Sequence, residues 1–523
     1  MNPLRTRREF LSEVGRGMLV ATVGLEAATD LGVAPAIAGG SDTKELSFGS
    51  LEPLVRLMQE TKPDRLMTEL AAKLRTGTEL RQLVAAAAFA NARTFGGEDY
   101  VGFHTMMALA PSFHMAQELS GDARALPVFK VLYRNTNRIQ EHGGRKDETL
   151  HPVEPGSLSA GQAGDEQLRE AVRRKDVAAA EQTFAALAAK SPEEALQAVL
   201  TTVQDNTEVH RVVLPYRAWD LMGIIGREQA HTLLRQSVRY CIRAETSNPN
   251  STWNEPRTLL PKLLEEHKLL GRTPGGKSAD DAWVESFCET LFKSTATQAA
   301  EAAATALAEG MDPSAIGEAI TLAANQLVLR DMGRPPNAEV SGKPIGSVHG
   351  DSIGVHATDS ANAWRNLARV SQGRHQFACL ILGAYQVALD RSARGGDFTT
   401  WKPLPYGWQF DQIQKMTDAD KILGELNEAV RGNLQARACG LVHRLGELGH
   451  SPRPIQDILL RYAISEDGAL HAEKFYRTSC EEFSATREKF RWRHLIALAR
   501  VTASEYGRPA PGVAEARSLL KVT

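Results

Sequence analysis

One short pattern occurs four times in the chain, as Asp99-Tyr-Val-Gly-Phe-His104, Asp205-Asn-Thr-Glu-Val-His210, Asp351-Ser-Ile-Gly-Val-His356 and Glu466-Asp-Gly-Ala-Leu-His471. In every copy an acid lies five residues before a histidine, and a large apolar residue directly precedes that histidine. Self-similarity at a long period is typical of proteins built from repeated structural units. The pattern therefore predicts four related units, each with one equivalent acid and one equivalent histidine.

The sequence around each histidine predicts four helices per copy, two upstream and two downstream. Three of the second helices open on proline at their first turn, where its missing N–H costs no hydrogen bond. The expected helices are 66–74, 78–92, 105–119 and 126–139; 180–189, 192–202, 211–225 and 230–244; 299–309, 313–329, 357–370 and 376–391; and 438–448, 454–464, 472–486 and 493–506.

We therefore predict an all-α fold of four quasi-equivalent repeats of about 100 residues. One such unit cannot bury all its apolar faces alone, so the four are expected to pack into one integrated body. The predicted boundaries are 45–142, 165–246, 279–395 and 410–508. The repeat does not decide between a closed ring and an open arc.

Composition excludes several classes of protein. The net charge is −2, so no basic surface field favours a nucleic-acid partner. The five cysteines form no Cys-x-x-Cys pair, which removes the signature of a zinc ribbon, a thioredoxin-like site or c-type haem attachment. Most of them are expected to be buried helix residues, because a free cysteine behaves as a small hydrophobic residue.

The N-terminus resembles a twin-arginine export signal in Thr6-Arg-Arg-Glu-Phe-Leu11. A modestly apolar stretch follows and ends in the small-x-small site Ala36-Ile-Ala38. Glu26 and Asp30 make that stretch too polar for a stable membrane span. We expect residues 1–38 to be a signal peptide read by the bacterial twin-arginine (Tat) machinery. The mature protein would be periplasmic or otherwise exported, without a transmembrane segment and often with a cofactor loaded before export.

The repeated histidines and acids predict a metal site. A carboxylate that binds one imidazole nitrogen fixes the ring so that the other nitrogen can ligate a metal. The candidate ligands are His104, His210, His356 and His471, with Asp99, Asp205, Asp351 and Glu466 as orienting groups or alternative ligands bridging two ions. Four imidazoles suit a transition metal ion such as Fe, Cu or Zn, with haem between opposed pairs less favoured.

A structural role is the competing interpretation of the same residues. Each acid would cap the following helix, and each histidine would bind the backbone of a neighbouring copy. Ten residues after the motif histidines stand His114, Asp220, Asn366 and Glu481, for which we favour pairing between helices over a second metal-binding layer. His349, in a donor-rich loop of the third copy, is a further candidate ligand, as is His114.

The third copy resembles a known family in His356-Ala-Thr-Asp359-Ser-Ala-Asn362-Ala. This stretch is similar to a helix start of questin oxidase-like proteins, over about fifty residues of the copy. The resemblance implies a helical, histidine-rich protein, an oxidoreductase activity of the kind that opens an anthraquinone ring, and a role for His356.

Three functions fit the sequence, in this order. The first is an exported metal-binding protein, a metal-dependent oxidoreductase acting on a small-molecule substrate, which requires the four imidazoles to meet within about 5 Å of one point or in two pairs. The second is a non-catalytic helical-repeat module that binds a ligand or protein in an apolar groove, with structural Asp/His motifs. The third is a metal-free hydrolase or lyase with an Asp–His general base, which predicts one motif in a pocket and the others buried.

Overall fold

The computed structural model describes residues 45–247, 254–393 and 398–522, so the twin-arginine segment lies outside the described residues. The all-α prediction is confirmed, because the described residues contain helices and three isolated β-bridges but no strand. From Ser47 onward the chain forms one compact unit. Among the described helices, none combines the length and the apolar character needed to cross a bilayer.

The main helices fall into four successive sets of five, and the four helices expected from the sequence are the last four of each set. The first two sets are α3 (Glu52–Glu60), α4 (Pro63–Arg75), α5 (Leu80–Phe95), α6 (Tyr100–Gln117) and α7 (Ala125–Glu141), then α8 (Gly164–Arg173), α9 (Val177–Ala188), α10 (Pro192–Val203), α11 (Val209–Ile225) and α12 (Ala230–Ser247). The last two are α14 (Asp281–Lys293), α15 (Ala296–Ala308), α16 (Pro313–Arg330), α17 (Ile353–Val370) and α18 (Arg374–Ala393), then α20 (Ala419–Arg431), α21 (Gln435–Glu447), α22 (Arg453–Ser465), α23 (His471–Ala485) and α24 (Trp492–Glu505). The connecting helices are α13 (Pro256–Glu266), α19 (Trp408–Ile413) and α25 (Val513–Leu520), with short 3₁₀ turns η1 (Gly49–Leu51), η2 (Gly121–Arg124) and η4 (Pro336–Ala338).

Local capping starts the helices where the sequence places them. The Ser191 hydroxyl accepts from the Glu194 N–H at 3.1 Å, and the Asp312 carboxylate accepts from the Ser314 N–H at 2.8 Å. In both helices the next residue is proline, which needs no partner in the first turn. These caps satisfy donors that a helix start would otherwise leave unpaired.

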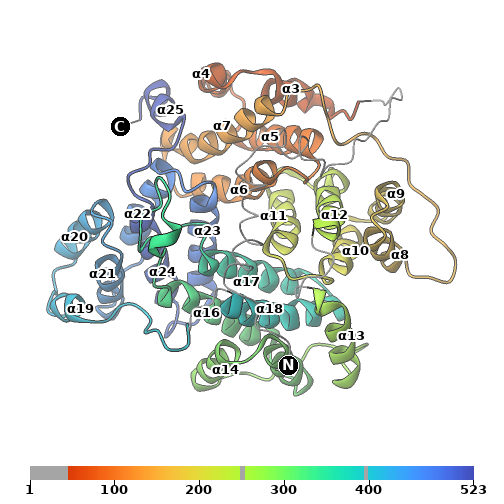
Figure 1. The fold of residues 1–523 in the computed structure, drawn as a ribbon. Coiled ribbons are helices and arrows are strands. Elements are labelled where there is room, and N and C mark those ends of the chain that lie inside the picture. The colour runs from red at the N-terminus through yellow and green to blue at the C-terminus, as the bar shows by residue number, and fades with distance from the viewer. Residues whose placement is uncertain (1–44, 248–253, 394–397, 523) are drawn as a thin grey trace. The chain divides into compact units, whose positions relative to one another are not determined.

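A ring of four helices, α6, α11, α17 and α23, occupies the middle of the molecule (Figure 1). Each contacts the next, and α23 returns to α6, so the ring is closed. In each set the helices on either side in sequence, such as α5 and α7 around α6, pack against the ring helix from outside. The ring helices are therefore covered on nearly all sides by their neighbours.

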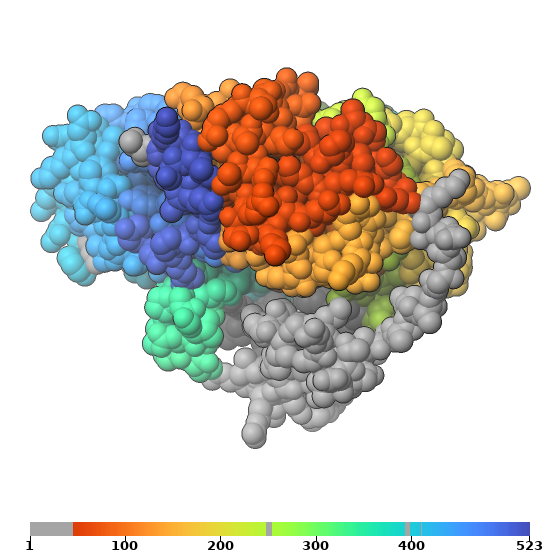
Figure 2. All heavy atoms as spheres, turned by 90° about the horizontal axis from the view of Figure 1, so that it is seen from above, coloured from red at the N-terminus to blue at the C-terminus, as the bar shows by residue number. Residues whose placement is uncertain are grey.

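The C-terminal helix joins the last part of the chain to the first. Helix α25 packs on α4 and α7, and the Arg75 guanidinium donates to the Leu519 carbonyl at 3.3 Å. The dark blue C-terminal residues accordingly lie beside the red and orange N-terminal set in Figure 2. This contact and the contact of α23 with α6 both close the ring between the fourth and first sets.

All five cysteines, which lie within the described residues, are buried and free. The expectation that they serve as core residues fits this placement.

Candidate functional site

The four motif histidines, the first predicted site residues, meet at the N-terminal ends of the ring helices. The Nε2 atoms of His104 and His210 are 3.2 Å apart, and those of His356 and His471 are 3.1 Å apart. Around the ring, successive imidazole centroids are separated by 4.7 Å (His104–His210), 5.7 Å (His210–His356), 5.1 Å (His356–His471) and 5.2 Å (His471–His104). Residues more than a hundred positions apart thus form one cluster, which we call the four-histidine centre.

The four ring helices run in the same direction away from this centre. His114 of α6 and Asp220 of α11, ten residues beyond their motif histidines, are again in contact, with His114 Nε2 3.0 Å from Asp220 Oδ1. Farther along α17 and α23, the Asn362 amide donates to the Glu482 carboxylate at 2.8 Å. Pairing between helices is therefore the observed role of His114.

Burial keeps the imidazoles of His104, His356 and His471 neutral. The pKa of His104 and of His471 is well below the ordinary value, first because of burial and then because of the nearby Lys474 ammonium. Burial, followed by the charges of His210 and Lys474, lowers the pKa of His356 to about 3. Neutral imidazole keeps a lone pair on one ring nitrogen, which is the form that ligates a metal or accepts a hydrogen bond.

Three of the rings have an oxygen atom at Nδ1. The contacts are His104 to the Tyr100 carbonyl at 2.7 Å, His210 to the Glu208 carboxylate at 2.5 Å, and His471 to the Ala469 carbonyl at 3.1 Å. These oxygens only accept, so Nδ1 carries the proton in all three rings. His104 and His471 are neutral, so their Nε2 lone pairs face the centre, where His104 Nε2 meets His210 Nε2 at 3.2 Å.

The four repeated acids do not bind these imidazoles, which corrects the prediction that they orient or replace them. Asp99 caps α6 by accepting from the Gly102 N–H at 2.7 Å and forms an ion pair with Arg138 at 2.6 Å. Asp205 forms an ion pair with Arg173 at 2.6 Å, and Asp351 forms ion pairs with Arg334 at 2.8 Å and Lys343 at 2.7 Å. Glu466 accepts from the backbone N–H groups of Gly507 and Arg508 at 2.9 and 2.7 Å. A charged guanidinium or ammonium binds a carboxylate more strongly than a neutral imidazole N–H does. The acids therefore anchor the loops that lead into the histidine-bearing helices.

Glu208 is the carboxylate that orients an imidazole, and the repeat pattern did not single it out. Besides His210 Nδ1, it accepts from the backbone N–H of His210 and Arg211 at 3.0 and 3.1 Å, and from the Tyr240 hydroxyl at 2.6 Å. Although burial raises the pKa of Glu208, the charge and hydrogen bonds of His210, with the Tyr240 hydrogen bond, lower it to about 2. Its place as the residue before α11 is the signal that would have found it, because acids favour helix starts.

The loop before α17 supports His471 from outside. A Cβ atom on Gly350 would lie 2.2 Å from His471 Cβ, so only glycine fits against this side chain. On the other side, Ala469 and Leu470 adopt left-handed backbone with φ of 49° and 67°, a strained conformation for residues with side chains. The neighbouring His349 is not part of the centre, since its Nε2 contacts the Arg508 guanidinium at 3.2 Å.

One turn deeper along the ring helices, the four positions equivalent in sequence are Met107, Val213, Asp359 and Lys474. The Thr478 hydroxyl donates to Asp359 at 2.9 Å and accepts from the Arg217 guanidinium at 2.9 Å. Charged and polar groups thus continue from the four-histidine centre into the core of the ring. Burying such groups is costly unless they are hydrogen-bonded or paired with an opposite charge.

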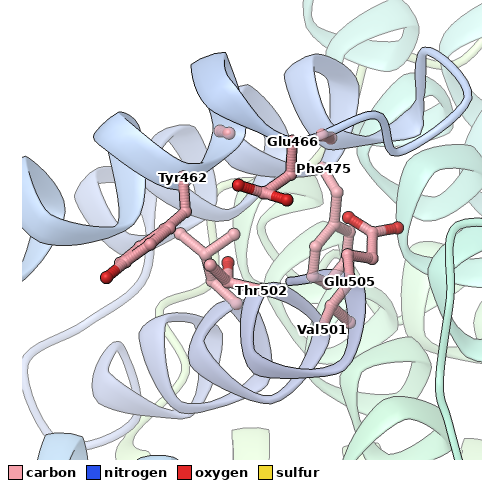
Figure 3. Close-up of a pocket in the computed structure, with 9 residues that line it drawn as sticks. Tyr462, Glu466, Phe475, Val501, Thr502 and Glu505 are labelled. Carbon is pink, nitrogen blue, oxygen red and sulfur yellow. The ribbon is translucent and has the colours of Figure 1, made fainter. Parts of the chain in front are cut away.

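A small cavity lies between α22, α23 and α24 (Figure 3). Its lining includes Glu466, Ala472 and Glu505, and it has room for about one water molecule. Ala472 directly follows His471, so this cavity lies behind the fourth motif. It is too small to receive a substrate.

Comparison with family models, with curated proteins and with solved structures finds no match for this chain. In the parts of the chain that the structure describes, no group of three or more His, Cys, Asp or Glu side chains is arranged as it stands to hold a metal ion. The Nε2 contacts of the four-histidine centre join its rings as two pairs.

Proposed function

We propose that the four-histidine centre binds one transition metal ion and that the protein is a metal-dependent oxidoreductase acting on a small molecule. The observation that carries the proposal is the convergence of four histidines, three of them buried, from four separate helices. If the imidazoles bound no shared ligand, apolar residues could fill the same space without the free-energy cost of removing polar groups from water.

The spacing of the nitrogen atoms supports one metal ion. For metal–nitrogen bonds of about 2.0–2.1 Å, the edge of a tetrahedron is about 3.3–3.4 Å. The two Nε2 pairs, at 3.2 and 3.1 Å, are already close to that length. Rotation of the side chains that brings the two pairs together would complete the set of four ligands.

The ligand chemistry favours Fe, Cu or Zn, because imidazole suits all three and no thiolate takes part in the centre. The oxygen partners at Nδ1 of His104, His210 and His471 would hold these rings in the metal-binding tautomer. A bound iron or copper ion would supply one-electron exchange. The resemblance of the third copy to questin oxidase-like proteins favours an oxidative reaction.

Export of the folded, metal-loaded protein to the bacterial periplasm by the Tat machinery is part of the proposal. Its support is the twin-arginine-like sequence at Thr6–Leu11. A cofactor inserted before export would escape competition from the metals outside the cytoplasm.

The two other functions fit this geometry less well. A general base in one motif predicts one motif in a pocket and the others buried, whereas the four rings lie together in one cluster. A purely structural role predicts hydrogen bonds from the motif histidines to the backbone of neighbouring copies. Instead the Nδ1 atoms of His104 and His471 bind backbone oxygens two to four residues away.

Metal analysis tests the proposal. Protein with its leader intact is produced in a bacterial host and analysed by plasma mass spectrometry, together with His104→Ala, His210→Ala, His356→Ala and His471→Ala. His375→Ala is the matched control, since His375 is a buried histidine of the third copy that contacts Gln204 and not the centre. We expect about one metal per chain in the wild type and the control, and a loss of tenfold or more in metal affinity in each of the four variants.

Two results would count against the proposal separately. A metal-free wild type would make the histidines architectural. A metal that shows no spectral change on reduction with dithionite and reoxidation with ferricyanide would leave the metal site in place and remove the oxidoreductase activity.

A further inference from the structure

Lys474 lies directly beneath the four-histidine centre, one helical turn beyond His471. Its side chain is only 2% exposed. In the described part of the chain, its ammonium group has no hydrogen bond and no ion pair. The equivalent positions in the first two copies are the apolar Met107 and Val213, so this charge is particular to the fourth copy.

The charge of Lys474 acts on the imidazoles of the centre. Among neighbouring charges it is the one that most lowers the pKa of His104 and of His471, and it also lowers the pKa of His356. Burial lowers the pKa of Lys474 itself to about 8, offset in part by Asp359 across the ring. At neutral pH the group is therefore mostly charged.

A second buried lysine shows how the same fold satisfies such a charge. Lys130 is also 2% exposed, but it donates to the carbonyls of Ala463 and Glu466 at 2.7 Å each and pairs with Glu473 at 2.7 Å. Lys474 has no comparable set of acceptors. Among the nearby carboxylates, Asp359 raises the pKa of Lys474 most, but its hydrogen bond comes from the Thr478 hydroxyl and not from Lys474.

The electrostatics of the centre favour an anion. The imidazoles carry no negative charge, so only the Glu208 carboxylate at His210 would offset the charge of a bound metal ion. The four ring helices begin at the centre, and each helix start contributes about half a positive charge. The Lys474 ammonium adds to this positive potential without an acceptor of its own.

We propose that Lys474 is the anion-binding residue of the four-histidine centre. It donates a hydrogen bond to an anion that coordinates the metal, either a small inorganic anion or a carboxylate oxygen of the substrate. This inference rests on the proposed metal site and names the class of ligand that the site takes.

Anion titration of the metal-loaded protein tests the inference. Azide serves as the inorganic anion and formate as the carboxylate, and binding is followed by the absorption spectrum of the metal. For Lys474→Met we expect unchanged metal content and an anion dissociation constant at least ten times higher, because a charge-assisted hydrogen bond is lost. Lys474→Gln, which keeps a donor without the charge, should show an intermediate loss.

Lys489→Met is the control for removing one positive charge, since Lys489 is exposed on the surface and its Nζ lies 3.8 Å from Glu285. It should bind azide as the wild type does. If azide binds tightly and formate does not, the site takes small inorganic anions. If formate also binds, and its binding depends on Lys474, the site takes carboxylates.

A readout without metal separates the two proposals. Lys474→Met should raise the melting temperature of the metal-free protein, because it removes a buried charge without a hydrogen-bond partner. A lower melting temperature, or full azide affinity in a metal-loaded Lys474→Met protein, would overturn the role of Lys474. Failure of the wild type to bind metal would overturn the metal site instead.

Discussion

At the scale of single residues, the buried carboxyl group of Glu505 binds the loop that supports His471. One of its oxygens accepts from the Gly350 N–H at 3.0 Å, and Gly350 in turn lies against the His471 side chain. The charged groups that face it are Lys130 on α7, Glu473 on α23 and Arg508 after α24. Burial raises the pKa of Glu505 to about 7, so near neutral pH the folded chain holds a proton on this group.

Glu505 predicts that the stability of the protein falls as the pH rises from about 4.5 to about 7. Its ordinary pKa is 4.5 and its folded pKa is about 7, so its contribution is complete below 4.5 and is lost as the pH rises through 7. The loss amounts to at most about 3 kcal/mol. Glu505→Gln keeps an acceptor for Gly350 but cannot ionise, so its advantage in melting temperature over the wild type should be greater at pH 8.5 than at pH 5. Glu515→Gln, at an exposed position on α25, is the control, and parallel curves for wild type and Glu505→Gln would contradict the prediction.

The four histidines could be predicted from the sequence, but the partners of the acids could not. A fixed spacing identifies equivalent residues without any knowledge of the fold. The arginine that binds Asp99 is 39 residues away, and the one that binds Asp205 is 32 residues away on the other side. Such pairs follow no common spacing, because three of the acids bind whichever cation the local packing brings near and Glu466 binds backbone N–H groups instead.

At the scale of elements, periodicity predicted the helices next to each motif and missed the first helix of each set. Helices α3, α8, α14 and α20 are short and carry charged residues, and each bury only three or four residues. Gly102 and Gly354 lie inside α6 and α17. A Cβ on Gly354 would lie 2.6 Å from the Val328 backbone nitrogen, so this glycine lets α17 approach α16.

The contact between the loop before α17 and the start of α23 predicts the effect of one added methyl group. In Gly350→Ala the new Cβ would overlap the His471 side chain and displace it from the centre. We expect at least a tenfold loss of metal affinity, measured by competition with a chelator of known affinity, and a stability loss of about 1–3 kcal/mol. The control is Gly276→Ala, whose Cβ would meet no atom within 4 Å. Wild-type affinity in Gly350→Ala would show that His471 is not a ligand.

At the scale of the whole molecule, the closed ring makes the centre a property of all four sets. The sequence of one copy does not reveal how it packs on the next, so a ring and an open arc were equally compatible with the repeat. The decisive contacts are those of α23 with α6 and of α25 with α4 and α7, between residues more than 300 positions apart. Because each set supplies one imidazole, the four histidines come together only when the ring closes.

A metal bound by all four sets should therefore stabilise the whole fold rather than one part. At a free metal concentration about 1,000 times the dissociation constant, binding adds about 4 kcal/mol to the free energy of unfolding. For a chain of this size the unfolding entropy is about 1 kcal/mol per degree, so the melting temperature should rise by about 4 °C. Calorimetry of metal-loaded and chelator-treated protein measures this shift, which each single histidine-to-alanine variant of the centre should abolish and His375→Ala should retain. If the rise in melting temperature persists in two or more of those variants, the metal binds elsewhere. A site built from one ligand of each set cannot lose ligands and still stabilise the closed ring to the same extent.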